Sequence, residues 1–187
     1  MTDAAASEEW IGDVIGFWFE ELGRARWFAK DGDVDAAIRD RFLILYEVLS
    51  GWAAADALTS ARRALATVIV LDQFPRNMFR DTPQAFATDA LARAIAQGAI
   101  AQGLDDGLEA EHRIFLYLPL EHSEEKDDQA LSVALISGLG DAEFTRYALA
   151  HKAVIDRFGR FPHRNAVLGR TSTPEELAFL AEPGSAF

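Results

Sequence analysis

Three short polar segments interrupt the otherwise apolar pattern of this chain, and each contains a proline. They read LDQFPRN at 71–77, LPLEHSE at 118–124 and RFGRFPHRN at 157–165. Side chains of these types can transfer protons and bind anions, because imidazoles titrate near neutral pH and guanidinium forks match carboxylates and phosphates. The three segments are therefore the first candidates for a functional site.

Asp72 occupies a position that conflicts with its charge. It follows Leu65, Val68 and Ile69 by seven, four and three residues, which places its carboxylate on the apolar face at a helix carboxyl end. Burial and the helix dipole both disfavour a negative charge there. Asp72 therefore needs a cationic partner, and the pattern leaves open whether it serves a structural ion pair or a functional site.

Two of the segments share a Phe-Pro step followed by polar donors, QFPRN at 73–77 and RFPHRN at 160–165. The second lies in a basic stretch, 151–170, with five Lys or Arg, two His and one acid in a chain of net charge −12. Arg, His and Asn beside a turn can cradle a carboxylate or phosphate. The alternative is that the asparagines close turns and the arginines extend over the surface.

The histidines differ in what their spacing indicates. His122 follows Leu118 at helical spacing and would face inward on a continued helix, although Pro119 weakens this inference. His151 lies on an apolar stripe, which favours a structural histidine over a ligand or base, and His112 has no informative context. No ligand spacing such as HExxH is present, so neither a metal nor a cofactor is expected.

We predict a ligand-binding site drawn from all three segments and the arginine that follows the third. Its candidate residues are Asp72, Gln73, Arg76, Asn77, His122, Glu124, Arg160, His163, Arg164, Asn165 and Arg170. The candidates for catalysis within this set are His122, His163 and Asp72. The prediction requires the three segments to meet in space.

Helical periodicity accounts for almost all of the chain that must position these residues. No stretch alternates with the period of two that a strand demands. Glycine and proline divide the pattern into about eight helices, and their short connections favour antiparallel hairpins stacked side by side. The expected fold is therefore all-α, as a single domain over 1–187.

Two prolines predict where helices end. Pro75 is expected to stop the third helix near 72–74, because proline cannot donate the helical hydrogen bond. Pro119 is expected to separate a helix at 109–118 from one at 124–136.

Capping residues predict several other boundaries. Asp33 is a candidate N-cap for the second helix, and Asp141 for a longer helix that Gly159 closes. The sequence from Thr173 to Glu176 reads as a capping box with proline at the first helical position. A short last helix follows from it.

Composition excludes several classes of partner and location. Thirty acidic residues stand against 18 basic ones, so DNA and anionic membranes would be repelled. The chain has no cysteine, its amino terminus is acidic where a secretory signal would be basic, and its apolar runs fall short of the ~20 residues that a membrane span needs. We expect a cytoplasmic protein that binds neither nucleic acid nor membrane.

Several long motifs occur together in a fixed order: FWF at 17–19, RWF at 26–28, LDQFPRNMFR at 71–80, LYLPLEHSE at 116–124 and RFGRFPHRNAVLGRTSTPEE at 157–176. In this the chain resembles the bacterial family known as domain of unknown function 924. The resemblance implies a right-handed helical array similar to tetratricopeptide repeats, with the motif positions gathered in one cleft. It implies no reaction, substrate or cofactor, and the chain itself shows no clear 34-residue period.

Three functions remain open on these grounds. The favoured one is binding of a small anionic metabolite or acidic peptide in a groove lined by the three segments, because a basic, loop-borne stretch in an acidic protein suits an anion site. The second is a hydrolase or transferase with His122 or His163 as general base and arginines that stabilise developing charge. The third is an adaptor whose groove contacts another protein. The oligomeric state is not specified.

Overall fold

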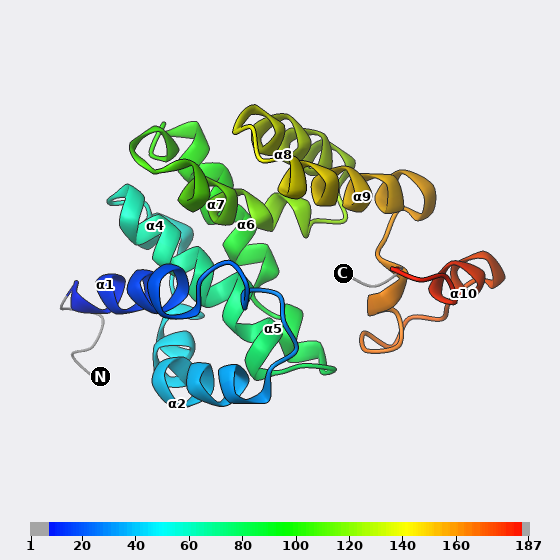
Figure 1. The fold of residues 1–187 in the computed structure, drawn as a ribbon, viewed down its shortest axis with the longest axis horizontal. Helices are drawn as coiled ribbons and strands as arrows, with labels where there is room; N and C mark the ends of the chain where they lie inside the picture. Colours follow the sequence, from blue (N-terminus) through cyan, green and yellow to red (C-terminus); the bar gives the residue numbers. More distant parts are fainter. Residues whose placement is uncertain (1–7, 185–187) are drawn as a thin grey trace. The chain divides into compact units, whose positions relative to one another are not determined.

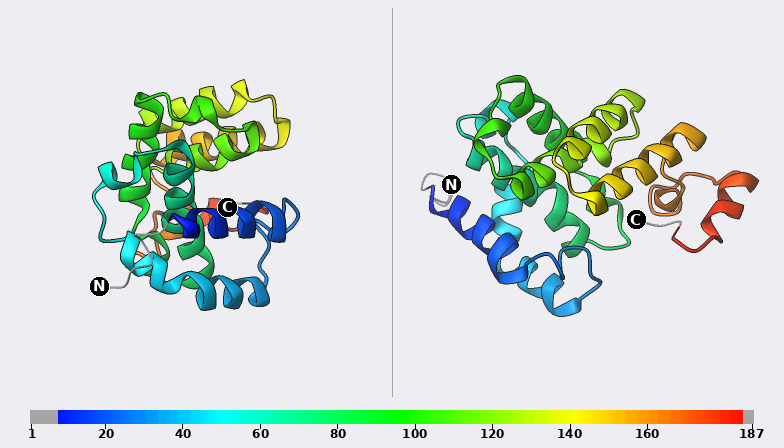
Figure 2. Two further views of the ribbon diagram at one scale, coloured as in Figure 1. Left: turned by 90° about the vertical axis from the view of Figure 1, so that its left-hand side faces the viewer. Right: turned by 45° about the horizontal axis from the view of Figure 1, so that its top comes forward.

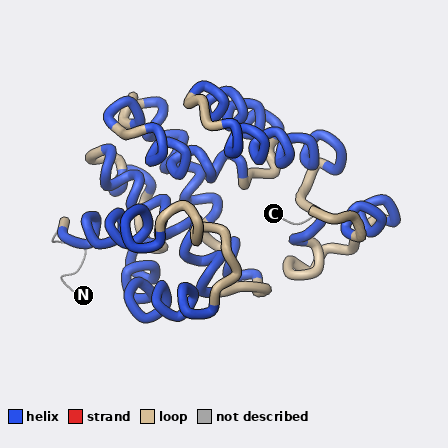
Figure 3. The backbone as a smooth tube through the Cα atoms, in the orientation of Figure 1, coloured by secondary structure: helices blue, strands red, loops and turns tan. Residues whose placement is uncertain are grey.

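The computed structural model describes residues 8–184. In that range the regular elements are helices and no strand is present, which confirms the all-α prediction (Figures 1 and 3). Backbone contacts divide the chain into unit 1, Met1–Arg80 with Gln84–Pro119, and unit 2, Asp81–Pro83 with Leu120–Phe187. The single domain and the tetratricopeptide-like array stay predictions.

Unit 1 is built from short helices joined by π-helical and 3₁₀ segments. In chain order these are α1 (Glu9–Ile15), the π-helix η2 (Gly16–Leu22), α2 (Gly32–Leu49), α3 (Ala54–Ala57), α4 (Ala61–Val68), the π-helix η3 (Ile69–Gln73), α5 (Phe74–Met78), the 3₁₀ turn η4 (Pro83–Phe86), α6 (Asp89–Ala101), the 3₁₀ turn η5 (Asp105–Gly107) and α7 (Ala110–Glu121). The last residues of α7 and the first of η4 belong to unit 2.

Aromatic rings fill the core of unit 1. Trp18 is fully buried, and its ring centroid lies 5.7 Å from that of Phe74 and 5.6 Å from that of Phe115. Tilted and edge-on aromatic pairs of this kind stabilise a core beyond the area they bury. Helix α2 packs against α5, and α6 packs against α3 and α4.

The predicted helix stop before Pro75 is wrong. Helix α4 continues through η3 into α5, and Pro75 lies in the first turn of α5, where a missing N–H is tolerated. In an uninterrupted α-helix the residue at this position would donate to the Leu71 carbonyl. The Thr88 hydroxyl donates to that carbonyl instead, at 2.5 Å, so a side chain replaces the bond that proline cannot make.

The predicted division at Pro119 is also wrong, because Pro119 lies inside α7. The helix is buried on several sides just before the proline, at Phe115, Leu116, Tyr117 and Leu118. The free energy gained from this packing exceeds the cost of the one backbone hydrogen bond that Pro119 cannot donate. The helix therefore reaches Glu121, at the start of the EHSE motif.

Unit 2 consists of the end of α7 followed by α8 (Lys126–Gly138), α9 (Ala142–Phe158), the 3₁₀ turn η6 (Pro162–Arg164) and α10 (Pro174–Leu180). Helices α8 and α9 lie side by side, as Figure 2 shows from two further directions. Phe161, in the loop after α9, packs against Val154 and Ile155 of that helix. The loop that carries RFPHRN is therefore anchored on α9.

The predicted caps of α9 and α10 are confirmed. The Asp141 carboxylate accepts from two amides of the first turn of α9, and Gly159 closes this helix with φ +70°. The Thr173 hydroxyl and the Glu176 carboxylate form the capping box of α10. For α2 the prediction is wrong by two residues, since Asp31 is the N-cap and the Asp33 amide donates to it.

No helix within residues 8–184 combines the length and the apolar character needed to cross a membrane.

Candidate functional site

The structure divides the eleven predicted site residues between the two units. Asp72, Gln73, Arg76 and Asn77 lie in unit 1, on η3 and α5. The remaining residues lie in unit 2 and are His122, Glu124, Arg160, His163, Arg164, Asn165 and Arg170. One groove formed by all three motifs stays a prediction.

In unit 1, Asp72 has the cationic partner that its buried position requires. Its carboxylate lies 3.3 Å from Arg76 Nη1, and its other oxygen accepts from the Gln73 amide at 2.5 Å. Arg76 also donates to both oxygens of Asp89, at 2.9 and 3.0 Å. Burial lowers the pKa of Arg76, but the charges of Asp72 and Asp89 outweigh it and raise the pKa above the ordinary value. The contacts support a structural ion pair.

Asn77 also bonds within unit 1. Its amide donates to Asp35 Oδ1 at 2.9 Å, and Arg80 donates to both oxygens of the same carboxylate at 2.6 and 2.8 Å. Asp35 belongs to α2, so Asn77 helps to attach α5 to α2.

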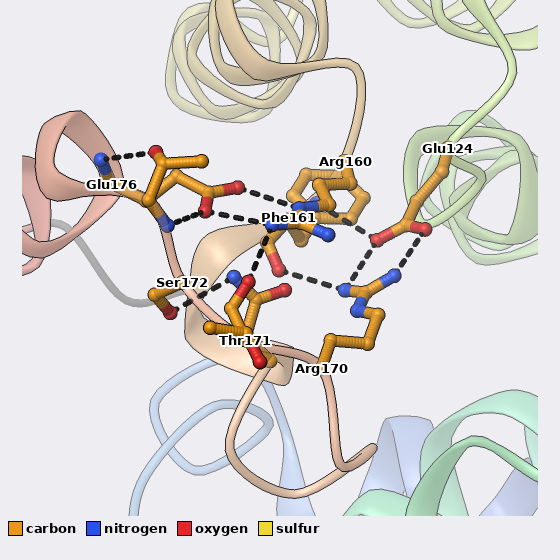
Figure 4. A network of polar contacts seen from close by, with 9 residues as sticks. Glu124, Arg160, Phe161, Arg170, Thr171, Ser172 and Glu176 are labelled. Carbon is orange, nitrogen blue, oxygen red and sulfur yellow. Dashed lines mark hydrogen bonds and ion pairs between the residues drawn. The ribbon is translucent and has the colours of Figure 1, made fainter.

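In unit 2, Arg160 and Glu176 form the first half of a carboxylate–arginine network (Figure 4). Arg160 donates to both Glu176 oxygens at 2.6 and 2.8 Å, and to the Thr171 carbonyl at 2.9 Å. The bond from Arg160 is the main cause that lowers the pKa of Glu176 to about 2. Arg160 thus holds the loop before α10 to the first turn of that helix.

Arg170 and Glu124 form the second half of this network (Figure 4). Arg170 donates to both Glu124 oxygens at 2.7 and 2.9 Å. Glu124 also accepts the Phe161 amide at 2.8 Å, and Arg170 donates to the Phe161 carbonyl at 3.1 Å. Burial raises the pKa of Glu124, but these donors outweigh it and leave the pKa below its ordinary value. The backbone of Phe161 is therefore held on both sides.

The partners of Arg76, Arg160 and Arg170 bear directly on the predicted ligand site. Each guanidinium already contacts both oxygens of a carboxylate within its own unit. A ligand anion would have to compete with a charge that the fold itself supplies. We therefore assign these three arginines to the scaffold of the two sets.

Four polar side chains of unit 2 lie around one aromatic ring or next to a member of that group, and we call them, together with the ring, the Phe161 cluster. The cluster consists of Phe161, His122, His151, His163 and Arg164. The Phe161 centroid lies 5.6 Å from those of His151 and His163, and Arg164 Cζ lies 4.4 Å from it. The His122 ring lies 6.1 Å from that of His151. The cluster thus unites three imidazoles and a guanidinium.

His151 is oriented by Glu121. Its Nδ1 lies 3.0 Å from Glu121 Oε1 and 2.9 Å from the Tyr147 carbonyl, and both side chains are buried. A carboxylate on one ring nitrogen is the arrangement that orients a histidine for proton transfer through the other. The sequence favoured a structural role for His151, and the bond to Glu121 is compatible with either role.

Sequence reasoning missed Glu121, although it lies inside the EHSE motif. The predicted break at Pro119 excludes Glu121 from the helix, whereas the structure places it as the last residue of α7, with a buried side chain. The signal in the sequence is a glutamate directly before His122, at the end of an apolar helical stretch, which indicates a carboxylate that a nearby histidine could contact. The side-chain amide of Gln129 fixes the same turn by donating to the Glu121 and Ser123 carbonyls at 2.5 and 2.7 Å.

The fourth histidine, His112, lies in unit 1 with its ring 4.2 Å from that of Phe19. Burial lowers its pKa. Within residues 8–184, no three side chains of the kinds that bind metals come together as a ligand group.

These observations define an all-α protein with a cluster of polar side chains on its last helices and the loop between them. Residues 14–184 match the family described as a bacterial protein of unknown function (DUF924), and the chain belongs to this family. A solved structure of a protein of unknown function from Agrobacterium tumefaciens is similar, with 37% sequence identity and a TM-score of 0.87. The similarity covers 96% of this chain and 99% of that one. No curated protein matches the sequence.

Proposed function

We propose that unit 2 binds a small anion, with a carboxylate or phosphate group, at the Phe161 cluster. The observation that supports this proposal is the gathering of His151, His163 and Arg164 around the Phe161 ring, with His122 next to His151. Imidazole and guanidinium groups supply N–H donors, and bonds from such charged donors to anions are among the strongest hydrogen bonds.

The surrounding contacts support a site whose geometry is set before a ligand arrives. Glu124 and Arg170 hold the backbone of Phe161, and Glu121 holds His151. A binding group that is already ordered loses less conformational entropy when the ligand binds. The cluster therefore has the rigid support that a small-ligand site requires.

Isothermal titration calorimetry with inorganic phosphate and with acetate tests this proposal. Arg164→Gln should weaken binding about tenfold or more, because it removes the only guanidinium of the cluster. Arg157→Gln is the matched control, since Arg157 also stacks on a phenylalanine, with Cζ 4.7 Å from the Phe158 centroid, outside the cluster. Thermal unfolding of both variants establishes that they fold.

Two results would overturn the proposal. If Arg164→Gln and Arg157→Gln bound phosphate as tightly as the unchanged protein, the anion site would lie elsewhere. If the unchanged protein bound neither anion, anion binding would be rejected and the adaptor function would become the leading candidate.

The contact between Glu121 and His151 is the observation behind a second candidate function, acid–base catalysis in a hydrolase or transferase. The general base would then be His151, in place of His122 or His163. Release of p-nitrophenol from p-nitrophenyl phosphate, abolished by His151→Gln and retained by His112→Gln, is the result expected from this candidate. A rate that His151→Gln leaves unchanged would exclude this role for His151.

A further inference from the structure

We infer that the Asp106–Gly107 step, in the turn η5, is a modification site at which aspartate converts spontaneously to isoaspartate, whereas the fold protects the second Asp-Gly step of the chain, Asp31–Gly32. Both steps lie in unit 1, so the inference is independent of the function proposed for unit 2. It follows from the different ways in which the structure holds the two carboxyl groups.

The reaction involves only the two residues of the step and water. The glycine nitrogen attacks Cγ of the aspartate, a C–N bond forms, and one carboxyl oxygen leaves as water. Water then opens the resulting five-membered succinimide at either ring carbonyl. Attack at the aspartate Cγ restores the original chain, whereas attack at its backbone carbonyl breaks the bond from that carbon to nitrogen. In the second case the chain continues through Cγ, with a free α-carboxylate, and nothing is oxidised or reduced.

Asp106 is exposed and weakly held. Its side chain is 82% exposed, and its Oδ1 lies 3.7 Å from Arg113 Nη2, a surface pair of the kind that contributes little. The turn η5 has three residues, and the Leu108 amide donates to the Asp105 carbonyl at its end, at 3.0 Å. Short 3₁₀ turns have poor hydrogen-bond geometry and open locally at low cost. Opening lets the exposed Gly107, which has no Cβ to restrict its backbone, bring its nitrogen to the Asp106 carboxyl.

Asp31 is held through both of its carboxylate oxygens. As the N-cap of α2 it accepts from the amides of Asp33 and Val34, at 3.0 and 3.3 Å, through Oδ1. Its Oδ2 accepts from Arg26 at 2.7 Å, and this bond is the main cause that lowers the pKa of Asp31 below its ordinary value. Succinimide formation must expel one of these oxygens as water, which is easier from the neutral acid than from the anion. It must also break the cap of an 18-residue helix, so the fold opposes the reaction at this step.

Peptide mapping of the full chain after several weeks at neutral pH tests this inference. Isoaspartate has the same mass as aspartate, so chromatography separates the isomeric peptides and their backbone fragments locate the changed residue. The folded protein should contain at least about tenfold more isoaspartate at 106 than at 31, because local opening is much rarer at a capped helix start. In concentrated guanidinium chloride the two steps should agree within about threefold, because neither the cap nor the turn persists there.

Matched glycine variants test the route through the succinimide. A Cβ added at Gly107 would lie 4.0 Å from that of Ala61, so Gly107→Ala fits the turn. This change should lower isoaspartate formation at 106 by about tenfold, because the methyl group hinders ring closure. The control is Gly32→Ala, where a Cβ meets open space, and it should leave the amount at 106 unchanged.

Three outcomes would overturn the inference. One is equal isoaspartate at 31 and 106 in the folded protein, and another is none at 106 in the folded protein although the denatured chain forms it. The third is a Gly107→Ala protein that reacts as fast as the unchanged one. Should Gly107→Ala not fold, Asp106→Glu replaces it, because the longer side chain closes a six-membered ring much more slowly. Loss of the product in Asp106→Glu supports the inference, and persistence of the product overturns it.

Discussion

Arg160 donates hydrogen bonds to both carboxylate oxygens of Glu176, at 2.6 and 2.8 Å. The Glu176 carboxylate also accepts a hydrogen bond from the Thr173 backbone amide, at 2.7 Å. One carboxylate thus neutralises an arginine of the RFPHRN motif and caps α10. The bond from Arg160 lowers the pKa of this carboxyl to about 2, against an ordinary value of 4.5.

The depressed pKa of Glu176 predicts a specific loss of stability in acid. The charged form is favoured in the folded protein, so its contribution is complete above pH 4.5 and is lost as pH falls from 4.5 to 2. Thermal midpoints of the unchanged protein and of Glu176→Gln should therefore differ most near neutral pH and converge across that window. Glu175→Gln, which alters an exposed acid of the same turn, should show a smaller gap. A gap for Glu176→Gln that is constant with pH would contradict the assignment.

The bond from Thr88 to the Leu71 carbonyl predicts a coupled pair of substitutions. Thr88→Val keeps the shape of the side chain but removes the hydroxyl that donates to the carbonyl of the buried Leu71, which should cost about 1–3 kcal/mol in unfolding free energy. Pro75→Ala restores an N–H at the position that can serve Leu71, so the cost of Thr88→Val should be smaller in that background. Urea unfolding of the four proteins measures this coupling, and additive effects would refute it.

Gly159 is expected to resist substitution because α9 ends there in the left-handed conformation, with φ +70°. Gly159→Ala should destabilise the protein by about 1 kcal/mol or more, since a Cβ is strained in that region. Gly138, the last residue of α8, has open space around its Cα and no such backbone constraint. Gly138→Ala should therefore be neutral or stabilising by up to about 1 kcal/mol. Equal effects of the two changes on the unfolding midpoint would contradict this.

Tyr117 should ionise at a higher pH than an ordinary tyrosine side chain. Its hydroxyl donates to Asp105 at 2.5 Å, and burial followed by that bond raises its pKa to about 12. The neutral phenol thus stabilises the fold below pH 10 and loses this contribution between pH 10 and 12. Absorbance near 295 nm, compared with that of Tyr117→Phe, measures the step. A difference spectrum that titrates near pH 10 would show that the bond is not maintained.

The sequence predicted the helical class and the elements with strong local signals. Asp141, Gly159 and the Thr173 capping box act within a few residues, so their effect can be inferred without tertiary structure. The stops at Pro75 and Pro119 were wrong for a common reason. In each case a tertiary feature, the Thr88 hydroxyl or burial around α7, compensates for the missing N–H.

The candidate site was less accessible to sequence reasoning. The residue types in RFPHRN were recognised, but the carboxylate partners of Arg160 and Arg170 lie 16 and 46 positions away along the chain. No local sequence pattern shows that the guanidinium groups of these two arginines are already paired with carboxylates. The bond between Glu121 and His151 likewise joins two helices and depends on their packing.

The loop between α9 and α10 depends for its order on two carboxylates, one far before it in sequence and one directly after it. Glu124 precedes α8, whereas Glu176 lies in the first turn of α10, and both are needed to hold its arginines. Its native path can therefore form only after the turn before α8 and the start of α10 are in place. We expect this loop to be among the last segments to order during folding, so the Phe161 amide should gain protection from hydrogen exchange later than the amides of α8 and α9.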